Sequence, residues 1–219
     1  MLATISLVAA NPDPIEIVTS HGPARVHPRP ADGTARIGAL LLGHGAGGGV
    51  GAPDLMAATS AARTAGLDVY LVEQPYRVAG RRAPAPARQL DTAWLEVLEH
   101  LRADLVADVP LVVGGRSSGA RVACRTAADG GARGVLCLAF PLHPPGRAAD
   151  PSKSRLPELE AVSVPVLIVQ GERDPFGMPP AGPGRTIVTQ PGDHSLKGDL
   201  PGLRAAVGQW LSDLLTVGT

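Results

Sequence analysis

Pro110-Leu-Val-Val-Gly-Gly-Arg-Ser-Ser-Gly-Ala-Arg-Val-Ala123 is the stretch on which the interpretation of the whole chain depends. It begins as an apolar run typical of a buried strand, passes through a glycine and serine turn, and continues with residues that suit a helix. Within it, Gly115-Arg-Ser-Ser-Gly119 matches G-x-S-x-G, a pattern that places a serine on a tight strand-to-helix turn. The two glycines leave room where strand and helix crowd together. We therefore expect the hydroxyl of Ser117 to protrude at the end of a strand, with the N-terminus of a helix directed toward it.

Length and charge bound the class of protein. A chain of 219 residues can form one compact α/β domain with a full core, and we assign residues 1–219 to one domain. The 20 basic residues balance the 20 acidic ones, so no overall field attracts nucleic acid or an anionic membrane. We therefore expect a small-molecule substrate, with no nucleic-acid or membrane partner.

Met1 to Ala10 is apolar but lacks a basic segment and is interrupted by Asn11-Pro-Asp-Pro14, which argues against a signal peptide.

The two cysteines, Cys124 and Cys137, fall in a predicted helix and a predicted strand. Buried thiols are commoner at such places than a disulfide or a metal pair. We therefore expect a reducing, cytoplasmic location. The histidines show no spacing typical of metal ligands, so no metal is predicted. The oligomeric state is not indicated by the sequence.

Strands and helices alternate along the chain. Strands are predicted at 15–19, 24–27, 37–42, 67–72, 109–114, 134–140, 164–170 and 185–189, and helices at 54–65, 90–105, 120–128 and 203–215. The first two strands, within residues 1–30, are expected to form an edge hairpin, and 74–88 and 141–157 are expected to be loops. The alternation predicts a doubly wound, mostly parallel sheet without a separate lid domain.

Polar residues with catalytic chemistry follow several of the predicted strands, at the sheet edge where open α/β sheets bind ligands. A serine hydroxyl needs a base to take its proton, and the base needs an acid to hold its tautomer. Asp174 and His194 are the candidates, because serine, acid and base in this chain order form one of the known triad arrangements. Asp193 is a competing acid, although adjacent side chains rarely orient one another. His143 is a competing base.

An acyl-transfer site also needs N–H donors for the oxyanion. Ser118 is expected to supply one donor, and Ala46 or Gly47 in the loop Gly43 to Gly49 the other. His44, at the start of this loop, is another candidate base. Its position favours a role in the oxyanion loop over the role of base. The remaining candidates for substrate binding are Tyr76, Arg116, His143, Phe176 and Met178, together with His44.

Five segments carry a family resemblance. They are Gly43-His-Gly-Ala-Gly-Gly48, Gly114-Gly-Arg-Ser-Ser-Gly-Ala-Arg121, Phe140-Pro-Leu-His-Pro-Pro-Gly146, Gln170-Gly-Glu-Arg-Asp-Pro-Phe-Gly177 and Gly192-Asp-His-Ser195. Together they resemble the small, lidless α/β-hydrolase family near the dienelactone hydrolases, over most of the chain beyond residue 35. The family includes bacterial proteins and a related domain of a eukaryotic chromatin-complex subunit.

The resemblance implies an α/β-hydrolase fold and a cofactor-free serine hydrolase, with Ser117 as nucleophile, Asp174 as acid and His194 as base. The implied reaction is cleavage of a small ester, thioester or related acyl compound through an acyl-enzyme. Dienelactone hydrolases carry cysteine at the nucleophile position, so their substrate is not transferred to this chain. The chromatin relative implies an alternative, a binding module that keeps the fold without catalysis.

A dinucleotide-binding protein is a less favoured alternative. Gly43-His-Gly-Ala-Gly-Gly48 also fits G-x-G-x-x-G after a strand, and Glu73 ends the next strand, where a ribose-binding acid belongs. This hypothesis leaves the Ser117 turn and the Asp174 and His194 pair unexplained.

Overall fold

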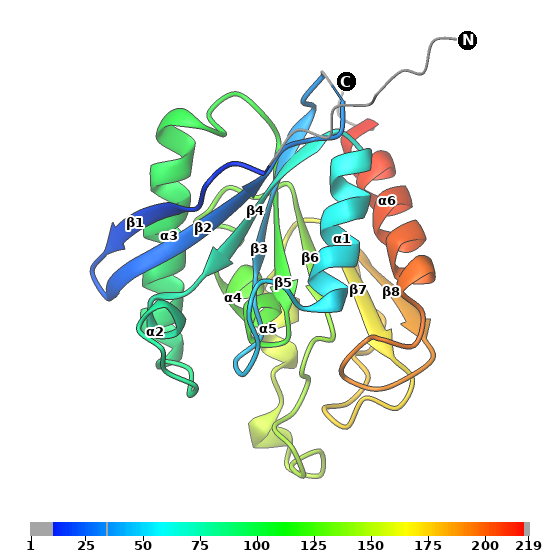
Figure 1. Ribbon diagram of the computed structural model, residues 1–219. Helices are drawn as coiled ribbons and strands as arrows, with labels where there is room; N and C mark the ends of the chain where they lie inside the picture. Colours follow the sequence, from blue (N-terminus) through cyan, green and yellow to red (C-terminus); the bar gives the residue numbers. More distant parts are fainter. Residues whose placement is uncertain (1–10, 34, 217–219) are drawn as a thin grey trace.

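The computed structural model describes residues 11–33 and 35–216 and contains one eight-stranded sheet flanked by helices (Figure 1). The expectation about a signal peptide in Met1 to Ala10 concerns residues outside this range. The strand order is β1-β2-β4-β3-β5-β6-β7-β8. The strands are β1 (Ile15–Thr19), β2 (Gly22–Arg29), β3 (Gly38–Gly43), β4 (Leu67–Glu73), β5 (Leu111–Arg116), β6 (Gly134–Leu138), β7 (Val166–Gly171) and β8 (Arg185–Gln190).

The sheet is mostly parallel, as the sequence predicts. β1 and β2 form an antiparallel hairpin, and β2 pairs antiparallel with β4. All pairings from β4 through β8 are parallel. Because β2 lies between β1 and β4, only β1 of the hairpin is an edge strand, which corrects the expectation that both are.

Helices cover both faces of the sheet (Figure 1). α1 (Pro53–Thr64) and α6 (Leu200–Thr216) pack on one face, and α3 (Ala87–Asp104), α4 (Ser118–Thr126) and α5 (Leu156–Glu160) pack on the other. α2 (Pro75–Val78) and the 3-10 turn η1 (Pro151–Lys153) lie in segments predicted to be loops, and α5 begins at the end of the second of these segments. No helix of the described residues is both long and apolar enough to cross a membrane.

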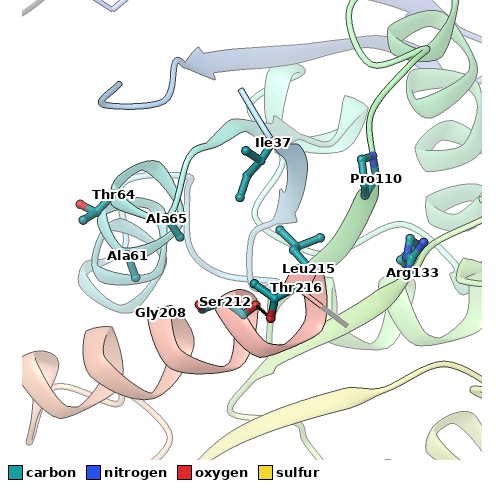
Figure 2. Close-up of a pocket in the computed structure, with 10 residues that line it drawn as sticks. All are labelled: Ile37, Ala61, Thr64, Ala65, Pro110, Arg133, Gly208, Ser212, Leu215 and Thr216. Atoms are coloured by element: carbon teal, nitrogen blue, oxygen red, sulfur yellow. Dashed lines mark hydrogen bonds between the residues drawn. The ribbon is translucent and has the colours of Figure 1, made fainter. Parts of the chain in front are cut away.

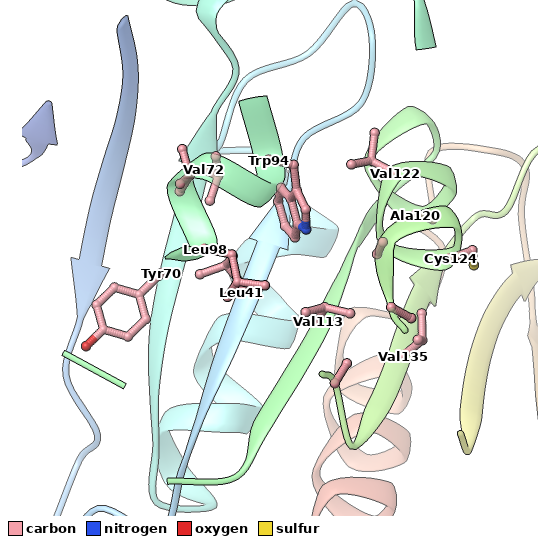
Figure 3. Packing of buried hydrophobic residues seen from close by; sticks show 14 of the residues in the cluster. Leu41, Tyr70, Val72, Trp94, Leu98, Val113, Ala120, Val122, Cys124 and Val135 are labelled. Carbon is pink, nitrogen blue, oxygen red and sulfur yellow. The ribbon is translucent and has the colours of Figure 1, made fainter. Parts of the chain in front are cut away.

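Side chains alternate between the two faces along each central strand. On β3, Leu40 and Leu42 pack toward α1 and α6, whereas Leu41 packs toward α3 and α4. Figure 3 shows the second of these layers, in which Trp94 of α3 lies over the sheet among Leu41, Val113 and neighbouring side chains. Ile37 was predicted to lie in this strand, but it precedes β3 and is 48% exposed.

Candidate active site

Ser117 lies on a tight turn between β5 and α4. Its φ and ψ are 51° and −109°, a conformation that residues other than glycine rarely adopt, and its N–H donates a hydrogen bond to the Leu138 carbonyl at 2.9 Å. A Cβ on Gly115 would lie 2.6 Å from the carbonyl oxygen of Gly43, and a Cβ on Gly119 would fall on the same oxygen. The two glycines are therefore required for β5 and α4 to approach β3.

Ser117, His194 and Asp174 form one hydrogen-bonded chain. The Oγ of Ser117 lies 2.9 Å from Nε2 of His194, and Nδ1 of His194 lies 2.8 Å from Oδ2 of Asp174. Asp174 follows β7 and is almost completely buried, and its Oδ1 accepts a hydrogen bond from the Phe176 N–H at 2.9 Å. The carboxylate is thus held at both oxygens. The Phe176 ring lies against the His194 ring, with centroids 4.2 Å apart.

Gln170, at the end of β7, is a contributor that the sequence analysis missed. Its buried Nε2 lies 2.8 Å from Oδ2 of Asp174, 3.1 Å from the Phe140 carbonyl and 2.9 Å from the Gly177 carbonyl. It thereby links Asp174 to the segment after β6 and to the loop after β7. A single amide side chain near the end of an otherwise apolar strand is the sequence signal that could have identified it.

The competing acid and base make other contacts. Oδ1 of Asp193 accepts hydrogen bonds from the hydroxyl and the N–H of Ser195, and these bonds lower the pKa of Asp193. His143 donates its backbone N–H to the Phe176 carbonyl, and its ring lies beside Gly177. The base bonded to Ser117 is therefore His194, and the carboxylate bonded to this base is Asp174.

Two candidate binding residues, His44 and Tyr76, form hydrogen bonds with the loop after β3. The buried ring of His44 donates from Nδ1 to the Gly45 carbonyl at 2.8 Å and accepts at Nε2 from the Gln74 N–H at 3.1 Å. Burial lowers the pKa of His44, which favours this neutral form. The Tyr76 hydroxyl donates to the Ala46 carbonyl at 2.9 Å. Both side chains are buried and make their hydrogen bonds to the backbone of this loop or of Gln74.

Arg116, another candidate binding residue, contacts two other residues of the chain. Its Nε lies 2.7 Å from Oδ2 of Asp54, and its Nη2 donates to the His194 carbonyl at 3.0 Å. Asp54 is fully buried in the first turn of α1. Burial raises the pKa of Asp54, and the Arg116 charge opposes this rise. Met178, in contrast, is 40% exposed and available to a ligand.

Comparison with known proteins identifies the family of this chain. Residues 36–199 match the family model described as an alpha/beta hydrolase domain. The chain belongs to the α/β-hydrolase family. A search of curated proteins finds no significant match.

Solved α/β hydrolases have the same fold. A lidless serine hydrolase from Xanthomonas campestris superposes with a TM-score of 0.73 at 20% identity, covering 94% of this chain and 96% of that one. The esterase Est1E from Butyrivibrio proteoclasticus superposes with a TM-score of 0.74 at 14% identity, covering 94% and 100%. A dienelactone hydrolase from Anabaena variabilis has a TM-score of 0.69 at 16% identity, covering 95% and 99%.

The features that suggested dinucleotide binding have other roles in this α/β hydrolase. Gly48 does not lead directly into a helix, because the turn residues 49–52 intervene before α1 begins at Pro53. The Glu73 carboxylate lies 3.6 Å from Nε2 of His27 and 3.8 Å from Nη1 of Arg25, both on β2. Glu73 therefore lies against Arg25 and His27 of the neighbouring strand and forms an ion pair with Arg25.

A cavity of about 620 Å³ lies at the other end of the α/β-hydrolase sheet from Ser117 (Figure 2). Ile37, Pro110 and Arg133 in its lining precede β3, β5 and β6, whereas Ser117 follows β5. The C-terminal turns of α1 and α6 complete the lining. This cavity is therefore separate from the hydrogen-bonded chain of Ser117, His194 and Asp174.

Proposed function

We propose that this α/β hydrolase is a cofactor-free serine hydrolase that cleaves a small ester, thioester or related acyl compound. The observation that carries the proposal is the chain of hydrogen bonds from Ser117 Oγ to His194 Nε2 at 2.9 Å and from His194 Nδ1 to Asp174 at 2.8 Å. A carboxylate at Nδ1 favours the tautomer in which Nε2 accepts a proton. Ser117 thus has a base in position to activate it.

In the proposed reaction, Ser117 Oγ attacks the acyl carbon while His194 Nε2 takes the hydroxyl proton. The tetrahedral intermediate collapses when its bond to the leaving alcohol or thiol breaks and His194 returns the proton to that group. Water then attacks the acyl-enzyme while His194 takes its proton. The second intermediate collapses when its bond to Ser117 Oγ breaks and His194 returns the proton to that oxygen, which releases the carboxylic acid. Asp174 holds the ring and stabilises its positive charge in both steps.

Two N–H groups are proposed to bind the oxyanion. Ser118 is the first residue of α4, so its N–H has no acceptor within the helix. The Gly45 carbonyl is turned toward the His44 ring, and in a trans peptide the Ala46 N–H must point the opposite way. Gly45 itself lies beside Ser117, since a Cβ on it would be 3.6 Å from the Ser117 Cβ. These positions support Ala46 and Ser118 as the two donors.

The acyl group is proposed to contact Phe176, which lies against His194, and the exposed side chain of Met178. His143, beside Gly177, is proposed to border the same surface. One similar structure is Est1E with ferulic acid bound. Feruloyl esters therefore belong in the substrate panel with 4-nitrophenyl esters and short acyl thioesters.

The decisive test is intact-mass labelling with a fluorophosphonate probe. We expect one adduct on the native protein and none on Ser117→Ala or His194→Ala, with circular dichroism showing that all three proteins are folded. Ser117→Ala should also lower the hydrolytic rate by roughly three orders of magnitude or more. Absence of an adduct on folded native protein would contradict the proposal and favour a non-catalytic binding module.

A further inference from the structure

The Arg116 guanidinium lies between the nucleophile turn and two neighbouring loops. Arg116 is the last residue of β5 and directly precedes Ser117. Its Nη2 donates to the backbone carbonyl of His194 at 3.0 Å, across 78 residues of sequence. Its Nη1 packs against the loop after β3, because a Cβ on Gly45 would lie only 2.8 Å from it. One side chain therefore contacts both the loop that carries the base and the loop proposed to bind the oxyanion.

Asp54 holds this guanidinium in place. The Asp54 side chain is fully buried, its Oδ1 accepts the Leu55 N–H at 2.9 Å, and its Oδ2 lies 2.7 Å from Nε of Arg116. A buried carboxylate needs a charged partner, so Arg116 is not free to turn away from it. The nitrogens of a guanidinium lie in one rigid plane, so the ion pair at Nε keeps Nη2 close to the His194 carbonyl.

We propose that Arg116, anchored by Asp54, is a positioning residue that keeps His194 within hydrogen-bonding reach of Ser117. This inference rests on the proposed function of the same site. Asp174 holds the ring of His194 from the β7 side, and Arg116 holds the His194 backbone from the β5 side. The two contacts together fix the base relative to the nucleophile. Arg116 thus acts through His194 and makes no contact with the substrate.

A second arginine provides a matched control. Arg125 of α4 forms a 2.6 Å ion pair with Asp91 of α3, and its side chain is 20% exposed, compared with 19% for Arg116. Its hydrogen-bond partners are Asp91 and Glu158, on α3 and α5, away from the loop that carries His194. Arg125→Met therefore removes a similar ion pair without touching the proposed contact.

Hydrogen exchange tests the geometry without requiring activity. In Arg116→Met, amides of residues 190–198 should exchange severalfold faster than in the native protein, because the tie to the His194 carbonyl is lost. Arg125→Met should leave exchange in this segment unchanged. Arg116→Met leaves the buried Asp54 carboxylate unpaired and could fail to fold for that reason alone. The double variant Asp54→Asn/Arg116→Met removes both charges and replaces the single variant in the exchange experiment in that case.

Kinetics with 4-nitrophenyl acetate test the consequence. We expect kcat of Arg116→Met to fall on the order of 10- to 100-fold, as for a small displacement of a reacting group, with KM nearly unchanged. Arg116→Lys keeps the charge but has a single nitrogen, which cannot bind Asp54 and the His194 carbonyl in the same fork. Arg116→Lys should therefore be more thermally stable than Arg116→Met, while its kcat should stay as low as that of Arg116→Met. Arg125→Met should retain the native kcat.

The outcomes separate this inference from the proposed function. A native protein that hydrolyses the ester and takes up the fluorophosphonate, together with Arg116 variants that keep native kcat and native exchange, would overturn the positioning role alone. A native protein without Ser117-dependent labelling would overturn the proposed function and with it the catalytic consequence. Exchange at residues 190–198 would then still decide whether Arg116 holds the loop.

Discussion

At the scale of single residues, Gly119 lies where the nucleophile turn leaves no room for a side chain. A Cβ at this position would fall on the carbonyl oxygen of Gly43, which is backbone and cannot rotate away. We expect Gly119→Ala to lower the free energy of unfolding by about 1–3 kcal/mol or more. Gly47→Ala is the control, since no atom lies within 4 Å of its added Cβ, and should change stability by less than about 0.5 kcal/mol. Urea denaturation measures both, and equal stability of the two variants would contradict the close approach.

His44 predicts a pH dependence of stability. Burial lowers its pKa below the usual 6.5, so the unfolded chain binds this proton more readily than the folded protein. The contribution of His44 is fully present above pH 6.5 and is lost as the pH falls below this value toward the lowered pKa. His44→Gln can donate and accept in similar positions but does not titrate. The loss of stability between pH 7 and 5.5 should therefore be smaller in His44→Gln, and an equal loss in both proteins would contradict the assignment.

Residues that belong to a local sequence pattern could be predicted as candidates for the site. Residues whose role depends on a contact with a distant part of the chain could not. Ser117 and its flanking glycines form a motif, and the contacts of Asp174 and His194 agree with their positions after strands. Asp54 resembled an ordinary acidic residue at the start of a helix, because its partner Arg116 is far away in the sequence. For the same reason, the contacts of Arg116 with Asp54 and with the His194 carbonyl were not predicted.

At the scale of elements, long segments were predictable and short ones were not. α1, α3 and α6 repeat their apolar residues over several turns, and each was predicted within a few residues. α2 and α5 have four and five residues, too few for a helical period to appear, and both begin with a proline in the first turn. Proline there is compatible with a helix, but residues 74–88, which contain α2, and residues 141–157, which include the start of α5, were predicted to be loops.

Gly208 in the middle of α6 offers a stabilising substitution. Open space surrounds the position of an added Cβ, and glycine inside a helix is unfavourable relative to alanine. Gly208→Ala should therefore raise the free energy of unfolding by about 0.5–1 kcal/mol. Chemical denaturation would measure this gain, and a loss of stability would show that α6 packs more tightly there than described.

The contact between α4 and β6 buries both cysteines, as predicted. The Sγ atoms of Cys124 and Cys137 lie 3.5 Å apart, and their hydrogen bond together with burial raises the pKa of Cys137 well above its ordinary value. Both thiols should resist Ellman's reagent in the native protein and react fully in guanidinium chloride, because the thiolate is the reactive form. Rapid reaction of either thiol in the native state would contradict this packing.

At the scale of the whole molecule, the hydrogen-bonded chain of Ser117, His194 and Asp174 and the cavity lined by Ile37 lie at opposite ends of the sheet. Parallel strands bring their carboxyl ends to one edge, and the residues that follow β3, β5, β7 and β8 meet there. The alternation of strands and helices was sufficient to predict that Ser117, Asp174 and His194 lie at this edge. The cavity behind Ile37 was not predicted, because Ile37 was assigned to the buried strand and is instead exposed.

The hydrogen bond between Ser117 and His194 spans 77 residues of sequence and joins the turn after the central strand β5 to the loop after the edge strand β8. Contacts between distant parts of a chain form slowly, because closing long loops costs entropy before the contact forms. During refolding, helical circular dichroism should therefore return before fluorophosphonate reactivity. The reactivity of Ser117 requires every strand from β5 to β8 to be in register. Its return would therefore report the completion of folding.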